Sequence, residues 1–248
     1  MPFKDHFSGH AALYRDARPL PPPAWYDWLA GQVPDAGLAW DAGCGNGQAS
    51  VALAAHFERV LATDPSADQI ANAQAHARID YSVEAAEHCS LQDGAASLVD
   101  VSQALHWFDL AAFHDEARRV LKPGGVIAVS AYGNCSVDRA VDAVERRLYA
   151  DTLADDWPPE RAQVDNGYRD LPFPFARIEA PTFEMRADWN LAQFLAYLRS
   201  WSATQRHIKA HDEDPVAAAA PALALAWGDA VRVRAVRWPF FTVVGRSA

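Results

Sequence analysis

The feature that most constrains the fold is a glycine-rich turn at residues 41–47. An apolar run at 37–40 leads into Asp-Ala-Gly-Cys-Gly-Asn-Gly, and a run compatible with a helix follows over 48–57. The order of strand, tight turn and helix is typical of an open parallel α/β sheet, in which nucleotide-like ligands bind beyond the carboxyl ends of the strands. Gly43 and Gly45 would allow close approach of the backbone to a ligand, and the helix would offer unpaired N–H groups.

The rest of the chain continues this alternation of strands and helices. Short apolar runs predict a series of strands at 38–42, 59–63, 79–83, 98–102, 126–130, 178–185 and 240–244. Intervening periodic segments predict helices at 25–33, 67–75, 110–121, 137–148, 190–201 and 214–228. We therefore predict an α/β, Rossmann-like, doubly wound sheet of about seven strands, mostly parallel with an antiparallel last strand.

We divide the chain into three parts of one fold. Residues 1–36 form a helical lid, 37–132 the ligand-binding core, and 133–248 the cap helices and final strands. In the lid, the apolar residues at 3, 7, 11 and 14 follow helical spacing, and a proline-rich stretch at 19–23 ends the helix. This helix either packs on the outside of the sheet or closes over the ligand, bringing Tyr14 and Arg18 to it.

An acidic residue stands where a ribose would bind. Asp64 lies 23 residues after Asp41, at the end of the second predicted strand. Acids at about this spacing accept hydrogen bonds from ribose hydroxyls. The alternative is a plain helix N-cap. The third glycine comes two residues after the second, where a dinucleotide fingerprint needs three, and the P-loop lysine is absent, so we expect a ligand without phosphates.

Composition excludes several classes of partner. The net charge is −10 and no run of Lys or Arg exceeds two residues, which disfavours nucleic acid. The three cysteines lack metal-type spacing, so we predict no metal site and a reducing, cytoplasmic setting. We see no secretory segment, and the apolar stretch at 216–227 is too short to span a membrane. We expect a monomer or weak homodimer that acts on a small molecule.

Four motifs together carry a resemblance to a known family. They are the glycine turn at 41–47, Asp64-Pro65-Ser66, Ala86-Glu87, and Arg-Val-Leu-Lys-Pro-Gly-Gly at 119–125. In order and spacing they resemble class I S-adenosylmethionine-dependent methyltransferases over residues 37–131. Residues 3–7 with Arg18-Pro19, then 103–108 and 200–203, are similar to a small-molecule subgroup that includes trans-aconitate methyltransferases.

The resemblance implies roles for individual residues. Gly43 and the turn would face the methionine part of S-adenosylmethionine, Pro65 would pack on its adenine, and the backbone carbonyl of Gln103 would hold the methionine end. Many relatives carry an acid where this chain has Ala85, so backbone groups would recognise the adenine amine. The implied cofactor-binding residues are Asp41, Gly43, Gly45, Asp64, Pro65, Ala86, Glu87 and Gln103, joined by Tyr14 of the lid.

The acceptor side is implied by His106 and Trp107, which follow the fourth strand. A carboxylate acceptor needs no base but does need a cation, for which Arg18 is the first candidate and Arg161 and Arg169 the second. A hydroxyl, thiol or amine would need a base such as His106, unless this histidine is only tied into a turn.

Some alternatives and further expectations remain from the sequence. The glycine turn and ribose acid also suit a nicotinamide oxidoreductase, and a binding protein without turnover would keep them too. We place His88 and His114 on the surface and Cys44 in the core, as a small packed residue.

Overall fold

The computed structural model describes residues 17–247 and is built around a seven-stranded sheet of order β3-β2-β1-β4-β5-β9-β6. The first five strands are parallel, and β9 runs antiparallel to both β5 and β6. The predicted α/β class and the antiparallel last strand are confirmed. The sheet strands are β1 (Leu38–Ala42), β2 (Arg59–Thr63), β3 (Ile79–Ser82), β4 (Ala96–Ser102), β5 (Leu121–Tyr132), β6 (Ala176–Ile178) and β9 (Phe240–Arg246).

The order of the strands positions the ligand site. The chain moves outward from β1 to β2 and β3, then returns to the other side of β1 with β4 and β5. The connections after β1 and β4 therefore leave in opposite directions, which opens a crevice at the carboxyl ends of these two strands. Asp41 of β1 lies beside Asp100 of β4 in the paired register, so the crevice begins immediately above this pair.

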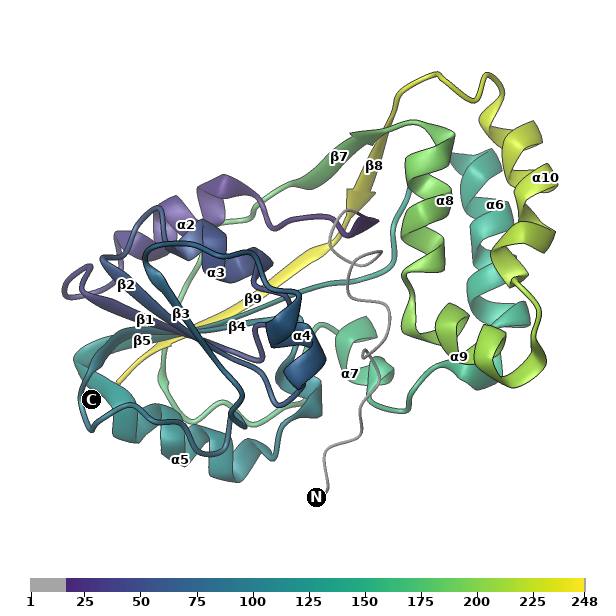
Figure 1. Cartoon of the computed structure of the whole chain (residues 1–248). Coiled ribbons are helices and arrows are strands. Elements are labelled where there is room, and N and C mark those ends of the chain that lie inside the picture. Colours follow the sequence, from purple (N-terminus) through teal and green to yellow (C-terminus); the bar gives the residue numbers. More distant parts are fainter. Residues whose placement is uncertain (1–16, 248) are drawn as a thin grey trace.

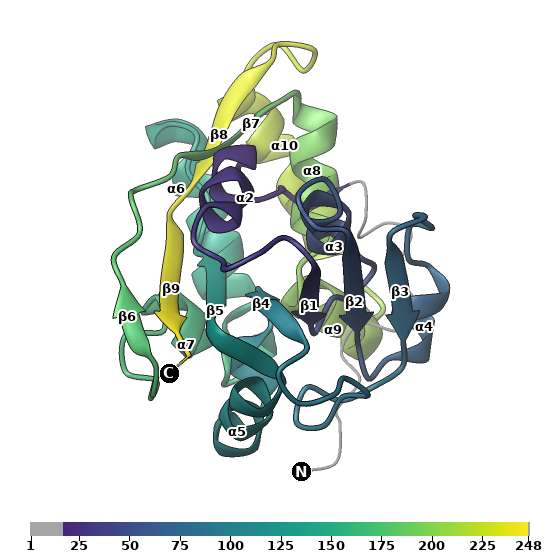
Figure 2. The same ribbon diagram turned by 90° about the vertical axis from the view of Figure 1, so that its left-hand side faces the viewer.

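Helices cover both faces of the sheet, with α2 and α3 on one face and α5 on the other (Figures 1 and 2). In α2, Trp25, Tyr26 and Leu29 are buried in the same cluster as residues of β1, β2 and α3. Residues 23–30 of the predicted lid therefore pack onto the sheet, whereas its expected helix around residues 3–14 lies outside the described residues. The helices are α2 (Pro23–Ala30), α3 (Gln48–Leu53), α4 (Ala67–Ala71), α5 (Leu110–Val120), α6 (Arg139–Arg147), α7 (Arg161–Asp165), α8 (Leu191–Arg199), α9 (Ser202–His211) and α10 (Pro215–Trp227).

A second, helical layer stands beside the sheet. Helices α6, α8, α9 and α10 gather around their own apolar cluster, which includes Phe194 and Trp227 (Figure 1). The antiparallel ribbon of β7 (Met185–Trp189) and β8 (Arg234–Trp238) joins this cap to the sheet. Three short helical turns, η1 (Leu105–Trp107), η2 (Leu148–Thr152) and η3 (Ala154–Asp156), complete the described elements. None of the helices within residues 17–247 is long and apolar enough to cross a membrane.

The prediction of one strand at 178–185 is wrong. Strand β6 ends at Ile178, and β7 begins at Met185 in a different sheet. Pro181 has no N–H to donate to a ladder, which prevents one continuous strand. Between the two strands, Phe183 packs edge-on against Trp25, with ring centroids 5.5 Å apart. This contact holds the segment between β6 and β7 against α2, on its way from the sheet to the cap.

Candidate active site

The glycine turn adopts a conformation that side chains would obstruct. Gly43 has a φ of +73°, and a Cβ atom there would meet Ala104 at 2.7 Å and Phe108 at 2.9 Å. The N–H groups of Gly43 and Cys44 donate to the carbonyl of Thr63 over 2.8 and 2.9 Å. The turn is thereby fixed to β2, and its inner surface forms one wall of a cavity. Cys44 is buried, as predicted, and burial raises the pKa of its thiol.

Asp64 closes this wall at the end of β2. One carboxylate oxygen accepts from the N–H of Gly45 and the other from the N–H of Ser66, both over 2.9 Å. The helix-cap alternative is not what the structure shows, because Ser66 caps α4 by accepting from Gln69 over 3.3 Å. Asp64 lines the cavity and is only half-buried, so its carboxylate faces the space in which a ligand would lie.

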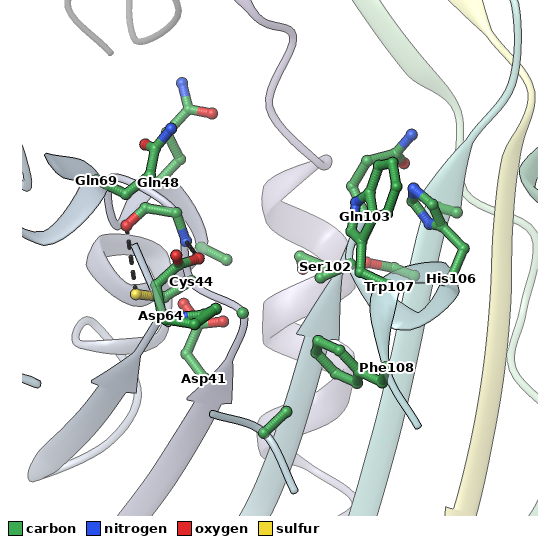
Figure 3. A pocket seen from close by; sticks show the side chains of 18 of the residues that line it. Asp41, Cys44, Gln48, Asp64, Gln69, Ser102, Gln103, His106, Trp107 and Phe108 are labelled. Carbon is green, nitrogen blue, oxygen red and sulfur yellow. Dashed lines mark hydrogen bonds between the residues drawn. The ribbon is translucent and has the colours of Figure 1, made fainter. Parts of the chain in front are cut away.

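The cavity occupies about 840 Å³, a size suited to a nucleoside-like ligand. Figure 3 shows Asp41, Cys44 and Asp64 on one side and Gln103, His106 and Trp107 facing them from the other. Within the described chain, every predicted site residue except the second-choice cations Arg161 and Arg169 lines it, whereas Tyr14 lies outside the described residues. The predicted residues that line it are Arg18, Asp41, Gly43, Gly45, Asp64, Pro65, Ala86, Glu87, Gln103, His106 and Trp107.

Gln103 has an unusual backbone for a residue with a side chain. Its φ is +57°, a left-handed conformation that costs a non-glycine residue free energy. Its side-chain amide compensates by bracketing the backbone of Tyr132, accepting from the N–H over 2.8 Å and donating to the carbonyl over 3.3 Å. These two bonds hold the side chain of Gln103 against β5 and fix the position of its backbone at the cavity.

In the segment that follows β3, the acidic side chains form hydrogen bonds with other groups of the protein. Glu87 accepts from the backbone N–H of Asp109 over 2.8 Å, and Asp109 caps α5 by accepting from Ala112. Glu84 binds Ser82 and the N–H of Ser90. The segment around Ala85 and Ala86 therefore presents mainly backbone to the cavity.

His106 is held as a neutral imidazole. Its Nδ1 lies 2.7 Å from the hydroxyl of Tyr168, and its ring packs against Trp107 with centroids 4.5 Å apart. Burial, reinforced by the positive charge of Arg161, lowers the pKa of His106 to about 3. Burial also raises the pKa of the Tyr168 hydroxyl, which therefore stays protonated and can donate to Nδ1. In that tautomer Nε2 carries the proton and acts as a hydrogen-bond donor.

Two arginines approach the site from distant parts of the chain. Arg18 donates to the carbonyl of Ser200 over 2.6 Å and to the hydroxyl of Tyr132 over 3.1 Å, so it ties the start of the described chain to the cap and to β5. Arg161 of α7 uses Nε for both Tyr149 and Asp165, over 3.1 and 3.0 Å. Among the described residues, no hydrogen-bond partner occupies its two terminal nitrogens.

Arg161 belongs to a smaller hollow, of about 40 Å³, beside the main cavity. Its guanidinium lies over the rings of Tyr149 and Trp157, 5.7 and 5.3 Å from their centroids. Trp201 packs against both rings. Four residues line both spaces, so the hollow continues from the main cavity: Arg18, Gln103, His106 and Trp107. The exposed Arg169, also a candidate from the sequence, lines neither space.

Two buried carboxyl groups, Asp41 and Asp100, lie side by side on β1 and β4, and Asp41 lines the floor of the cavity. Asp41 accepts from Ser50 over 2.5 Å, and Asp100 accepts from Ser102 over 2.9 Å. Burial raises the pKa of Asp41 to about 7, and burial together with the neighbouring Asp41 raises the pKa of Asp100. The pair therefore carries less than its full negative charge near neutral pH.

Part of the 119–125 motif has a structural role. Arg119 pairs with Glu116 over 2.7 Å and with Asp93 over 2.8 Å, and Lys122 pairs with Asp35 over 2.8 Å. These bonds fix the loops that enter β4 and β1. These bonds therefore stabilise the end of the sheet at which β1 and β4 begin, opposite the cavity.

One histidine assignment was wrong. His114 of α5 is buried, although His88 is exposed as predicted. Phe173 and Phe175 pack edge-on against the His114 ring, with centroids 6.4 and 5.8 Å away. They belong to the segment that enters β6, some sixty residues later in the sequence, which helical spacing in α5 cannot reveal.

The sequence analysis also missed several cavity residues. Ser102 and Tyr132 lie at the carboxyl ends of β4 and β5, where the rule that locates ligands in parallel sheets would have found them. The cavity residues that do not lie at the end of a strand are not marked by any such rule in the sequence. The missed residues include Asn46, Gln48, Gln69, Ser102, Phe108 and Tyr132.

Comparisons with known proteins agree with this site. Residues 40–129 match the family model described as a methyltransferase domain. A methyltransferase of Dictyostelium discoideum is 32% identical over 216 residues, which cover 86% of this chain and 82% of that protein. A solved structure of a type II methyltransferase from Anaeromyxobacter dehalogenans is 48% identical with a TM-score of 0.85, covering 92% of this chain and 97% of the other.

A more distant solved structure shows only the shared fold. It is a methyltransferase from an antibiotic biosynthesis pathway of Anabaena variabilis, 18% identical with a TM-score of 0.58, covering 90% of this chain and 98% of the other.

Proposed function

The chain belongs to the class I S-adenosylmethionine-dependent methyltransferases, and from this premise we propose that it methylates a carboxylate oxygen of a small molecule. The observation that carries this choice is His106. With a pKa of about 3, it is a poor general base at neutral pH, and it lies close to two arginines in the same hollow. An ionised carboxylate is already nucleophilic and needs a cation more than a base.

We place the cofactor along the main cavity. The turn at Gly43 and Gly45 would face its methionine part, with the carbonyl of Gln103 opposite. Asp64 would accept from the ribose hydroxyls. Pro65, Ala86 and Glu87 would enclose the adenine, and backbone groups would recognise its amine because Glu87 is bound to Asp109. The buried Asp41 would lie beneath the methionine end.

The acceptor would enter the smaller hollow. Arg161 can offer its two terminal nitrogens to a carboxylate in the paired geometry that arginine favours. Tyr149, Trp157 and Trp201 would shield this pair from water, which strengthens it. Nε2 of His106 would donate to the same carboxylate, and Arg18 would close the outer side.

Methyl transfer itself then requires mainly alignment. S-adenosylmethionine supplies an electrophilic methyl group on a sulfonium. One acceptor oxygen attacks the methyl carbon while the carbon–sulfur bond breaks, and S-adenosylhomocysteine leaves with the bonding electrons. No proton moves. The protein would hold the oxygen, the carbon and the sulfur in line and keep water out.

The alternatives meet specific difficulties. A hydroxyl, thiol or amine acceptor would need a base, and His106 is too weakly basic for that role. The net charge of −10 disfavours nucleic acid. Membership of the family argues against nicotinamide chemistry. The trans-aconitate subgroup stays a prediction from short motifs, and a protein that binds the cofactor without turnover is separated from an enzyme only by assay.

The test is to incubate the protein with methyl-labelled S-adenosylmethionine and a metabolite extract, and then to identify the labelled product. With that acceptor in hand, Arg161→Gln should raise the acceptor KM by about tenfold or more, because a charged pair is lost, while kcat changes less. Arg169→Gln is the matched control and should behave as wild type. An unchanged KM in Arg161→Gln would remove Arg161 from the acceptor site.

A further inference from the structure

A group of metal-type ligands lies in the cap, outside the two cavities. Asp156 ends η3, while His207 and His211 lie on α9. One ligand atom of each residue lies within 4.8 Å of the others. Nδ1 of His207 is 2.7 Å from a carboxylate oxygen of Asp156, and the rings of His207 and His211 are 4.5 Å apart between centroids.

The geometry of α9 brings the two histidines together. Residues four apart share one face of a helix, so both imidazoles point the same way. They also lie in the last turns of α9, where the partial negative charge of the helix end favours a cation. The side chains of Asp156 and His207 are each 16% exposed, and His211 is exposed, so an ion can reach the group from solvent.

We propose that Asp156, His207 and His211 bind a divalent transition-metal ion such as Zn²⁺ or Ni²⁺. Two imidazole nitrogens and one carboxylate oxygen suit these ions, whereas Mg²⁺ and Ca²⁺ prefer oxygen donors. The carboxylate has two compatible roles. It either binds the ion directly or holds Nδ1 of His207 while Nε2 binds the ion, an arrangement common in zinc sites.

The surrounding charges set a limit on affinity. The guanidinium of Arg206 lies nearby, with Nη1 3.4 Å from the backbone carbonyl of Asp156, and it opposes a cation. The carboxylate of Asp156 offsets this charge, and solvent screens it at the exposed rim. With three protein ligands, the remaining positions on the ion would be filled by water.

The location gives the site a structural consequence. Asp156 directly precedes Trp157, and α9 begins at Ser202, and both of these residues line the smaller hollow. A bound ion would tie the η3 turn to α9 and stiffen this wall. The proposal does not depend on the identity of the methyl acceptor, because it rests only on the geometry of the cap.

The test uses the full chain, free of affinity tags and stripped with a chelator, titrated calorimetrically with ZnCl₂ and separately with NiCl₂. We expect one ion per chain at this site, and far weaker binding of MgCl₂ and CaCl₂. His211→Ala, at an exposed position, should weaken binding at least about tenfold. Asp156→Asn should weaken it about 10- to 100-fold, the usual cost of losing a ligand's supporting carboxylate.

Histidines elsewhere provide matched controls. His6 and His10 have the same spacing in the sequence as His207 and His211, so a variant with both changed to alanine should keep the site. The exposed His76→Ala should do the same. Hydrogen exchange gives a second readout, since Zn²⁺ should slow exchange in residues 154–158 and in α9.

Three results would overturn the proposal. They are a wild-type chain that binds neither Zn²⁺ nor Ni²⁺, a His211→Ala variant that binds them as well as wild type, and loss of binding in the His6/His10 variant instead. Unchanged hydrogen exchange at 154–158 on ion binding would remove the structural link between η3 and α9.

Discussion

At the scale of single residues, Asp64 does two things at once. Its carboxylate holds the N–H groups of Gly45 and Ser66, and it is the group we assign to the ribose. We predict that Asp64→Ala abolishes measurable S-adenosylmethionine binding. Asp64→Asn, which keeps one acceptor oxygen for the turn, should still weaken binding strongly, because hydrogen bonds to a charged acceptor are the stronger ones.

Isothermal titration calorimetry measures this affinity directly. Ser66→Ala serves as the control, since it removes the cap of α4 and leaves the carboxylate in place. Unchanged affinity in a folded Asp64→Ala variant would contradict the ribose assignment.

His106 leads to a prediction about pH. A pKa of about 3 keeps its imidazole neutral throughout the range in which histidines ordinarily titrate. The profile of kcat/KM against pH should therefore show no histidine ionisation between about pH 5 and 8. His106→Gln retains a donor and should leave the shape of this profile unchanged. A limb near pH 6.5 that disappears in His106→Gln would instead identify a general base.

At the scale of elements, the sequence predicted most of the wall that we assign to the cofactor, but only isolated residues of the wall that we assign to the acceptor. The wall assigned to the cofactor is built from contiguous motifs, namely β1 with its turn, β2 with Asp64, and β4 with Gln103. The wall assigned to the acceptor is assembled from segments far apart in the sequence. Arg161 reaches the hollow from α7, and Tyr168 fixes His106 across 62 residues. Only tertiary packing brings such pairs together, and local spacing does not encode it.

Several elements of the cap were not predicted from the sequence, for different reasons. Helix α9 has a polar surface with weak apolar periodicity, so its sequence offers little helical signal. Strand β8 carries only a partial signal, since arginines alternate with apolar residues along 231–235 but the alternation changes phase before the buried Val236. Its partner β7 was hidden because Pro181 and Phe183 separate it from β6.

The start of α8 allows a test of element stability. Asn190 accepts from the N–H of Gln193 over 3.0 Å, and the side chain of Gln193 accepts from the N–H of Asn190, also over 3.0 Å. Asn190→Ala should lower the free energy of unfolding by about 1 kcal/mol. Gln193→Glu preserves the reciprocal pair and should cost little. Chemical denaturation measures both, and equal losses in the two variants would contradict the capping account.

At the scale of the whole molecule, two layers with separate apolar clusters enclose one continuous site. The sheet supplies the main cavity, which we assign to the cofactor, while the cap contributes Arg161 and the aromatic walls of the smaller hollow. Arg18 connects them through Ser200 and Tyr132. The chemistry therefore depends on how the layers are held together, which explains why the acceptor is so much harder to infer than the cofactor.

Global stability should depend on pH through the floor of the cavity. Folding raises the pKa of Asp41 from 3.8 to about 7, so the folded state binds more protons than the unfolded state between these values. The contribution of Asp41 to stability should therefore fall by roughly 4 kcal/mol at most as pH rises from about 4 to about 7 and then level off, while the lowered pKa of His106 acts in the opposite direction below about pH 6.5.

Asp41→Asn tests this dependence, because it removes the titrating group and also relieves Asp100 of a neighbouring charge. The difference in unfolding free energy between the variant and wild type should grow in favour of the variant as pH rises from about 4 to about 7. A difference independent of pH would contradict the assignment. Denaturant titrations at several pH values provide the measurement.

The central claim is methyl transfer from S-adenosylmethionine to a carboxylate, and the nature of the product bond tests it most directly. Methyl esters are cleaved by alkali, whereas methyl groups on ether oxygen, nitrogen, carbon or thioether sulfur are retained. We expect that label transferred from methyl-labelled cofactor to the acceptor is released as volatile methanol on mild alkaline treatment, and that Arg161→Gln forms less of this product at low acceptor concentration. Label that stays in the product after alkali would contradict the central claim.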